Sequence, residues 1–372
     1  HFPARYSIDG HFAWVPSNQK RNMPDWLNPQ APLLTKFLQE AGYATAHYGK
    51  WHLANDMIPD SPLPSAYGID EYGAFNCAGP QMFVHDDVKM AIPFIERSHE
   101  LGKPFFINLW MHEPHTPFHV DPKFMEQFSE LPQADAIYAA TLFHADLRIG
   151  QLLDALESNG LTEDTLVIFS SDNGPARGAP GTPLVLTYDT ATGLGYGLGA
   201  AKGITGGRLE YKGSLMEGGI GVPFIARWPG KVPAGVIDKT NIISAVDLLP
   251  TFCALADAPL PVDYRPDGIS QVSALEGKPT TGRETPLFWR MAKKSRAFAV
   301  VHKQWKMVAD SELSKFELFD LVADPLESKE LSSVQPEVVL ELKNLIVEWQ
   351  KTLPATPSGP VFSALRAENA LK

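Results

Sequence analysis

The chain has 372 residues, of which 44% are hydrophobic and 20% are charged. This composition is that of an ordinary globular protein, with enough apolar residues for one large core and a smaller unit. The formal net charge of -11 argues against a nucleic-acid-binding protein, because such proteins carry a broad basic face. Two cysteines are too few for a disulfide framework. No apolar run approaches the ~20 residues of a membrane-spanning helix, so we expect no membrane span.

Helical and strand patterns alternate along the first part of the chain. Three stretches place apolar residues at helical spacing: 32–41, 86–100 and 133–159. Four shorter apolar runs predict strands: 43–48, 104–110, 165–170 and 222–228. We expect the strands at 104–110 and 165–170 to be buried on both faces, and the helix at 86–100 to be interrupted or kinked at Pro93. This order predicts an α/β fold with a doubly wound mixed sheet flanked by helices.

The pattern changes beyond a Pro- and Gly-rich linker at 259–283. Strand-like runs occupy much of 297–321, and an amphipathic helix follows at 334–353. Strands followed by one helix predict a small antiparallel α+β unit. We therefore expect a large domain at 1–275 and a small C-terminal subdomain at 284–372.

Asp172 and Asn173 come directly after the apolar run at 165–170, and Gly174 and Pro175 end that run. Ligands bind at the carboxyl ends of the strands in open parallel sheets. A carboxylate beside a carboxamide suits a hard cation, which prefers oxygen ligands. The same residues also make an ordinary turn, so this segment alone leaves a metal site and a turn equally open.

Two other loops carry lysine and histidine directly after predicted strands, and one more lysine lies beyond a Gly-rich segment at 175–210. These side chains are Lys50, His52, His112, His115 and Lys212. The carboxyl ends of parallel strands meet at one edge of a sheet, so we expect convergence on one crevice. A cation with lysine and histidine donors fits the transfer of an anionic group, because they neutralise charge that develops on its oxygens. Histidine can also protonate a leaving oxygen near neutral pH.

Each of these residues also has an ordinary structural explanation. Lys50 could be a solvated surface lysine, and His112 and His115 could be hydrogen-bonded core or loop histidines. Pro114 excludes the helical geometry of a zinc-protease site. The glycines at 193–199 lack the spacing, the preceding strand and the later acidic residue of a dinucleotide site. All the structural explanations would have to hold together, which favours the chemical interpretation.

Four segments, in the right order over most of the chain, resemble signatures of the sulfatase family within the alkaline-phosphatase-like superfamily. Residues 42–52, Gly42-Tyr-Ala-Thr-Ala-His-Tyr-Gly-Lys-Trp-His52, resemble the G-Y-x-T-x-x-x-G-K-W-H signature. Residues 114–117 resemble its P-H-x-P element, and 171–174 resemble its metal-binding S-D-N-G. Residues 212–219 resemble its K-x-x-x-x-E-G-G element. The resemblance implies an arylsulfatase-like hydrolase of aryl or carbohydrate sulfate esters.

The resemblance also implies a role for each matching residue. Asp172 and Asn173 would bind one divalent ion, usually calcium. Lys50 and Lys212 would hold sulfate oxygens, and Lys212 or His115 would assist the leaving group. His52 would position or deprotonate the nucleophile, and His112 would contact the substrate. Where the family often has arginine after E-G-G-x, this chain has Gly221. We expect that arginine to have a structural role, so its loss does not argue against the resemblance.

One departure concerns the nucleophile, which in the family is a formylglycine made from Cys or Ser in a C/S-x-P-x-R motif. No segment of this sequence fits that motif, since Cys77-Ala-Gly-Pro-Gln81 has its proline one place late and no arginine. His1-Phe-Pro-Ala-Arg5 resembles the segment just downstream of the nucleophile. We therefore expect the chain to begin immediately after that motif, without one central strand, two metal ligands and the catalytic aldehyde. On this hypothesis the polypeptide alone is inactive.

Two alternatives stay open at this point. A phosphoesterase or phosphonate hydrolase of the same superfamily would prefer two transition metals with more Asp and His ligands. A sulfate- or glycan-binding relic would bind without turnover. The family also implies a secreted or periplasmic protein and a small-molecule or glycan sulfate ester as substrate. We expect loops such as 55–80 and 175–210 to select that ester.

Overall fold

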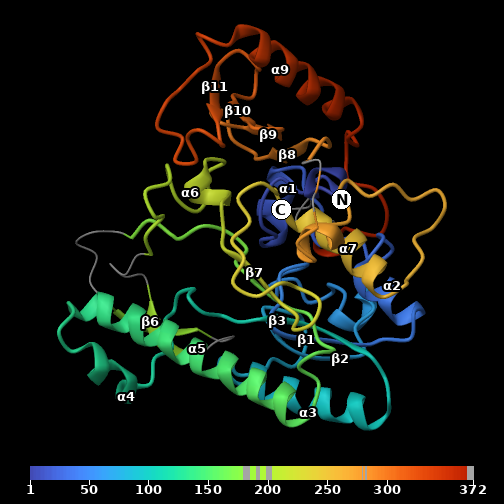
Figure 1. The fold of residues 1–372 in the computed structure, drawn as a ribbon, viewed down its shortest axis with the longest axis vertical. Coiled ribbons are helices and arrows are strands. Elements are labelled where there is room, and N and C mark those ends of the chain that lie inside the picture. The colour runs from blue at the N-terminus through green and yellow to red at the C-terminus, as the bar shows by residue number, and fades with distance from the viewer. Residues whose placement is uncertain (179–184, 190–192, 198–202, 279, 281–282, 367–372) are drawn as a thin grey trace.

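The computed structural model describes residues 1–178, 185–189, 193–197, 203–278, 280 and 283–366. Figure 1 shows an antiparallel sheet with helix α9 (Pro336–Lys351) at one end of the molecule. The long helices α3 (Asp87–Glu100) and α5 (Gln133–Ser158) lie at the opposite end. Among the described residues, no helix is both long enough and apolar enough to cross a membrane.

A parallel sheet of three strands forms the centre of the larger part. The strands β1 (Ala44–Lys50), β2 (Glu71–Phe75) and β3 (Phe105–Trp110) have the order β2-β1-β3. All pairs are parallel, so the carboxyl ends of the three strands lie at one edge. This edge carries Lys50 and the residues that follow Trp110, as the sequence pattern predicts.

Helices cover both faces of this sheet (Figure 1). α3 packs against β1, where Ala91 and Phe94 meet Ala46 and Tyr48 in one buried cluster. α2 (Leu34–Glu40) and α7 (Leu248–Leu255) pack together on the other side. The predicted doubly wound α/β arrangement is therefore confirmed. α3 continues through Pro93 as one helix, because the apolar packing of the following turn offsets the one hydrogen bond that proline removes.

Two regions that the sequence predicts as loops contain strands. β2 lies within 55–80, where Gly73 and a charged first residue hide the strand pattern. The Gly-rich segment 175–210 contains the antiparallel pair β5 (Val185–Asp189) and β6 (Gly193–Gly197). Glycine has no side chain to pack, so composition alone does not reveal this hairpin. The glycines at 193–197 therefore belong to a strand, and the rest of the run at 198–199 lies outside the described residues.

The strands at 104–110 and 165–170 are not buried on both faces, so that prediction is wrong. β4 (Val167–Ser170) pairs only with β7 (Phe224–Arg227) in an antiparallel pair, and β3 pairs only with β1, among the described residues. Exposure reaches 43% at Trp110, 46% at Phe169 and 59% at Ile225. Each strand has a neighbour on one side only, which leaves apolar surface in contact with solvent.

The C-terminal part is a separate antiparallel sheet covered by one helix, as predicted. Its strands are β8 (Leu287–Arg290), β9 (Phe298–His302), β10 (Trp305–Ala309) and β11 (Phe316–Asp320), in the order β11-β10-β9-β8. Trp349 of α9 stacks on Phe288 with ring centroids 4.8 Å apart. Phe2 meets both rings edge-on, so the first residues of the chain complete this core.

The remaining elements are short. The helices are α1 (Val15–Lys20), α4 (Pro122–Met125), α6 (Glu217–Ile220) and α8 (Val272–Leu275). The 3-10 turns are η1 (Pro3–Tyr6), η2 (Pro64–Tyr67), η3 (Val84–Asp86), η4 (Glu126–Phe128) and η5 (Ala245–Asp247). The proposed boundary between 1–275 and 284–372 stays a prediction, because the structure does not divide the chain into units.

Candidate active site

Lys50 stands at the carboxyl end of β1 because of the residue before it. Gly49 has φ +109, and a Cβ at that position would lie 2.0 Å from the carbonyl oxygen of Trp110. Only glycine allows β1 and β3 to approach so closely there. Buried His47 has its Nε2 3.0 Å from the carbonyl oxygen of Lys50, so the imidazole donates to that carbonyl and fixes the end of the strand.

A second close approach joins the loop of Asp172 to the loop of Lys212. The Gly174 N–H donates to the carbonyl oxygen of Gly219 at 2.9 Å, and a Cβ on Gly174 would lie 2.0 Å from the Gly218 carbonyl oxygen. The Lys212 N–H donates to the carbonyl oxygen of Pro175 at 2.9 Å. The glycines of the S-D-N-G and E-G-G segments are therefore needed where the two backbones touch.

The structure brings Lys50, Lys212, His115 and Asp172 close enough for their charges to interact. Burial is the largest cause of the lowered pKa of Lys50. The negative charge of Asp172 raises this pKa, and the positive charge of Lys212 lowers it further. Burial also lowers the pKa of His115; a hydrogen bond to Thr116 opposes this shift, while Lys50 and Lys212 add to it. Four groups from four segments of the chain thus lie close together. Three of them, Lys50, His115 and Asp172, lie at or just after the end of a strand, where ligands bind in such folds.

His52 belongs to the same group of side chains. Its Nε2 lies 3.0 Å from the carbonyl oxygen of Phe12, which can only accept, so this nitrogen carries the proton. Burial lowers the pKa of His52, opposed by this hydrogen bond, and the nearby charge of Lys50 adds to the lowering. His52 is thus held in one tautomer with Nδ1 left as the acceptor, which suits it to receive a proton.

His112 lies beside His115, with ring centroids 5.7 Å apart. It is buried, its Nε2 is 3.0 Å from the carbonyl oxygen of Pro117, and its ring meets Phe75 at 5.5 Å. Burial lowers its pKa to about 4 despite that hydrogen bond, so His112 is neutral near pH 7. In the structure His112 holds the loop that carries His115. Its predicted contact with substrate stays a prediction.

His11 lies beside the group and was missed by sequence analysis. Its ring centroid is 6.0 Å from that of His52. Burial lowers the pKa of His11, and the charges of Arg21, Lys212 and Lys50 lower it further. It comes from an irregular N-terminal stretch without a motif, so only the folded chain places this imidazole at the site.

Asp172 and Asn173 supply oxygen donors for a cation. Asp172 is exposed, and the side-chain amide of Asn173 donates to the carbonyl oxygen of Gly174 at 2.8 Å, so its other end, Oδ1, is the acceptor. A carboxylate with a carboxamide oxygen fits a hard divalent ion, although two donors are fewer than the 6–8 that calcium takes. In the described part of the chain, no three His, Cys, Asp or Glu side chains gather as a metal site.

A buried ionic network supports the loop between His112 and His115. Glu113 accepts a hydrogen bond from Arg148 at 2.5 Å and lies 3.1 Å from His85. Arg148 also donates to Asp87 at 2.5 Å. Burial by itself raises the pKa of Glu113, but His85 and Arg148 outweigh burial and lower this pKa to about 2. This network anchors the His115 loop to α3 and α5.

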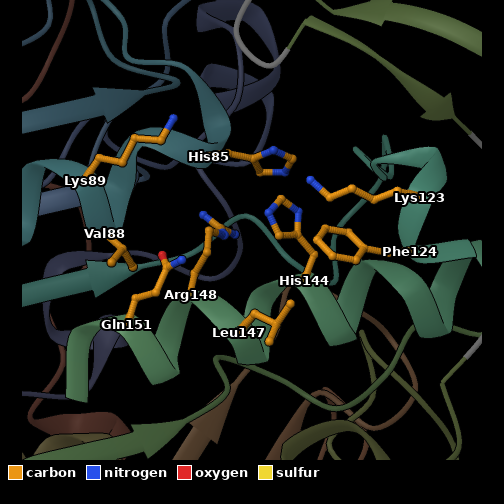
Figure 2. A pocket seen from close by; sticks show the side chains of 9 residues that line it. All are labelled: His85, Val88, Lys89, Lys123, Phe124, His144, Leu147, Arg148 and Gln151. Atoms are coloured by element: carbon orange, nitrogen blue, oxygen red, sulfur yellow. The ribbon is translucent and has the colours of Figure 1, made fainter. Parts of the chain in front are cut away.

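A cavity of about 300 Å³ opens beside this network. Figure 2 shows His85 and His144 facing each other there, with Lys123 and Arg148 nearby. The two imidazole centroids are 4.6 Å apart. Burial, with the charges of His85 and Arg148, lowers the pKa of His144 to about 4.

Comparison with known proteins agrees with this arrangement. The family model described as Sulfatase matches residues 14–258, which is more than half of the chain. A second model, N-sulphoglucosamine sulphohydrolase, C-terminal, matches residues 208–352.

Curated relatives are similar over about two thirds of this chain. An N-acetylgalactosamine-6-O-sulfatase of Bacteroides thetaiotaomicron is 30% identical over 261 residues, covering 66% of this chain and 47% of the relative. Arylsulfatase G of Rattus norvegicus is 29% identical over 298 residues, covering 67% of this chain and 54% of the relative. The chain thus matches about half the length of these relatives.

Solved structures share the fold. The crystal structure of Ps i-CgsB in complex with k-i-k-neocarrahexaose aligns with a TM-score of 0.75 and 24% identity, over 99% of this chain and 84% of that one. The structure named BT33336S-sulf, from work on glycosaminoglycan metabolism by Bacteroides thetaiotaomicron, aligns with a TM-score of 0.69 and 22% identity, over 88% and 83%. With the matching signatures gathered at one edge of an alkaline-phosphatase-like fold, the chain belongs to the sulfatase family.

Proposed function

We propose that the protein hydrolyses a sulfate ester, releasing an alcohol and inorganic sulfate. The convergence of Lys50, Lys212 and His115 around Asp172 is the observation that supports this proposal. Two ammonium groups can neutralise the three oxygens of a bound sulfate group, where negative charge is concentrated. The relatives that act on N-acetylgalactosamine sulfates suggest a carbohydrate sulfate ester.

Each residue has a separate task in this proposal. Lys50 and Lys212 hold the sulfate oxygens, and Lys212 or His115 gives a proton to the leaving oxygen. His52, whose proton lies on Nε2 so that Nδ1 is the acceptor, positions the nucleophile or takes a proton from it. His112 remains the proposed contact to the rest of the substrate.

Asp172 and Asn173 are the proposed ligands of one divalent ion, calcium in the family. The exposed carboxylate of Asp172 and the carboxamide oxygen of Asn173 are the donors that such an ion prefers. A bound divalent ion would neutralise charge on the sulfate oxygens and orient the group.

The nucleophile is the missing part of the machinery in this sequence. No C/S-x-P-x-R segment is present among the 372 residues. We therefore propose that this polypeptide alone binds sulfate esters without turnover, and that catalysis needs a formylglycine-bearing segment. We also propose export to the periplasm or the cell exterior, supported only by the family resemblance.

The test uses the sulfate and phosphate monoesters of one phenol, with calcium or with a chelator. We expect the chain to bind the sulfate ester more tightly than the phosphate ester and to release no phenol. We expect the sulfate ester to bind more weakly in the presence of chelator than in the presence of calcium. Lys50→Ala and Lys212→Ala should each weaken sulfate-ester binding by about tenfold, since each removes a charge-assisted contact. Exposed Lys103→Ala is the matched control and should leave affinity unchanged.

Three results would contradict parts of this proposal. Tighter binding of the phosphate ester would favour a phosphoesterase of the same superfamily. Unchanged affinity in Lys50→Ala would contradict the proposal that Lys50 and Lys212 hold the sulfate oxygens. Steady calcium-dependent release of phenol by the chain alone would show that its nucleophile lies among these residues.

A further inference from the structure

A second cavity, of about 240 Å³, adjoins Lys212 on the side of the C-terminal antiparallel sheet. Its walls come from three segments: Arg177 after the Asp172 loop, the loop 210–215 and the connection 291–296 between β8 and β9. The charged side chains at its wall are Arg177, Glu210, Lys212, Lys293 and Arg296. The cavity is smaller than the ~300–1,000 Å³ of typical ligand pockets, so it suits one sugar or one charged group.

The charge of this cavity is strongly positive although the chain as a whole is acidic, with a net charge of -11. Arg296 is neutralised, because it donates to Glu210 at 2.9 Å and to Glu317 at 2.8 Å. Within the described residues, no acidic side chain forms an ion pair with Arg177, Lys212 or Lys293. Three cations therefore face one opening with their charge uncompensated.

Two of these cations are held in place before any ligand arrives. The ammonium of Lys293 donates to the carbonyl oxygen of Gly213, beside Lys212, and an ammonium has two further N–H groups to offer. The guanidinium of Arg177 lies over the ring of Tyr211, 5.9 Å from its centroid. Preorganised donors of this kind bind an oxyanion with little loss of side-chain entropy.

We propose that Arg177 and Lys293 bind a second anionic group of the substrate, next to the sulfate that Lys50 and Lys212 hold. This inference rests on the proposed function and narrows its substrate class to a polyanionic glycan. The second group is an oxyanion, either another sulfate or a uronate carboxylate. The C-terminal antiparallel sheet thereby contributes to specificity through Lys293 of the connection between β8 and β9.

The location explains why one ligand would fill both sites. Lys212 lines the second cavity and also belongs to the candidate active site, so the two sites share a wall. An oligosaccharide with anionic groups on adjacent sugars would reach both at once. A substrate with one sulfate would leave Arg177 and Lys293 in water.

The test measures binding of the 372-residue chain to three synthetic disaccharides by calorimetry. One carries a single sulfate ester, one carries a second sulfate on the neighbouring sugar, and one carries a uronate carboxylate there. We expect the dianionic forms to bind about five- to tenfold more tightly, with a gain that shrinks in high salt. The double variant Arg177→Ala/Lys293→Ala should lose that gain and keep the affinity for the monosulfated form.

Matched variants separate this site from general surface charge. Lys294→Ala removes an exposed neighbour that does not line the cavity, and should leave all three affinities unchanged. Arg177→Ala alone leaves the hydrogen bond from Lys293 to Gly213 intact. This variant therefore tests the second cavity without disturbing the loop that carries Lys212. Inorganic sulfate at millimolar concentration should compete less well than the disaccharides.

The outcomes decide between this inference and the proposed function. Equal affinity for mono- and dianionic disaccharides, or an equal loss in Lys294→Ala, would overturn the second site. In another outcome, the disulfated form binds in a manner that depends on Arg177 while the monosulfated form does not bind at all. That result would support the second site and contradict the proposal that Lys50 and Lys212 hold a sulfate group. A gain for only one dianionic form identifies which oxyanion the cavity selects.

Discussion

Arg148 is the residue on which the support of the His115 loop depends. Its side chain is 6% exposed and contacts two buried carboxylates, those of Asp87 and Glu113. Burial raises the pKa of Asp87, while Arg148 opposes this shift. Two buried carboxylates thus share one guanidinium, with His85 close to Glu113.

We expect Arg148→Met to lower the free energy of unfolding by roughly 3–5 kcal/mol, because it leaves two buried carboxylates without their partner. Chemical denaturation measures this change. Arg97→Met is the matched control, since Arg97 pairs with Glu71 at 2.6 Å where both side chains are well exposed. That control should cost at most about 1 kcal/mol. Similar losses of unfolding free energy in both variants would show that the buried network stabilises the fold no more than an exposed ion pair does.

At the scale of elements, a buried ion pair ties the E-G-G segment to the C-terminal sheet. Lys306 of β10 is fully buried and lies 2.7 Å from Glu217 and 2.8 Å from Glu327. Glu327 also accepts a hydrogen bond from the Glu217 N–H at 2.7 Å. The loop that presents Lys212 is therefore held at its far end by the C-terminal sheet.

We expect Lys306→Met to lower the free energy of unfolding by roughly 3–5 kcal/mol and to weaken sulfate-ester binding, since Glu217 and Glu327 would repel each other. Denaturation and calorimetry measure the two effects. Lys351→Met is the control, because Lys351 pairs with Glu348 on the exposed side of α9. A variant that loses stability but binds sulfate esters as before would show that the network does not position the Lys212 loop.

At the scale of the whole molecule, the first residues of the chain join the larger part to the C-terminal core. Phe2 packs on Phe288 and Trp349, and its N–H donates to Asp267 at 2.9 Å. Arg5 also donates to Asp267, at 2.7 Å. Burial by itself raises the pKa of Asp267, but hydrogen bonds from His1, Arg5 and the Phe2 N–H outweigh burial and lower this pKa to about 2.

This lowered pKa predicts a change of stability with pH. The folded state holds the proton of Asp267 less tightly than the unfolded state, so its contribution is present above about pH 4 and is lost as pH falls towards 2. We expect Asp267→Asn to lose about 2 kcal/mol near neutral pH and less at pH 2. Denaturation at both pH values measures this difference, with exposed Asp263→Asn as the control. An equal loss at both would contradict the role of the charge.

The sequence by itself determined the α/β class, the C-terminal antiparallel unit and the family signatures. Apolar periodicity marks α5 and α9 because an amphipathic face repeats at helical spacing. The motifs place Lys50, His115 and Asp172 at or just after the ends of strands, so the rule for parallel sheets predicts that they converge. Lys212 is added by the family resemblance alone. Their catalytic and metal-binding roles remain proposals.

The tertiary structure alone decided what depends on partners far apart in sequence. β2 is a strand because β1 supplies its hydrogen bonds, although Gly73 weakens its pattern. β3 and β4 are half-exposed because burial depends on how many neighbours a strand has, which no local pattern records. His11 joins the site, and Arg177 and Lys293 share one cavity, through chain packing that sequence spacing does not encode. Local physics sets the elements, whereas the surroundings of each charge are set only when distant segments meet.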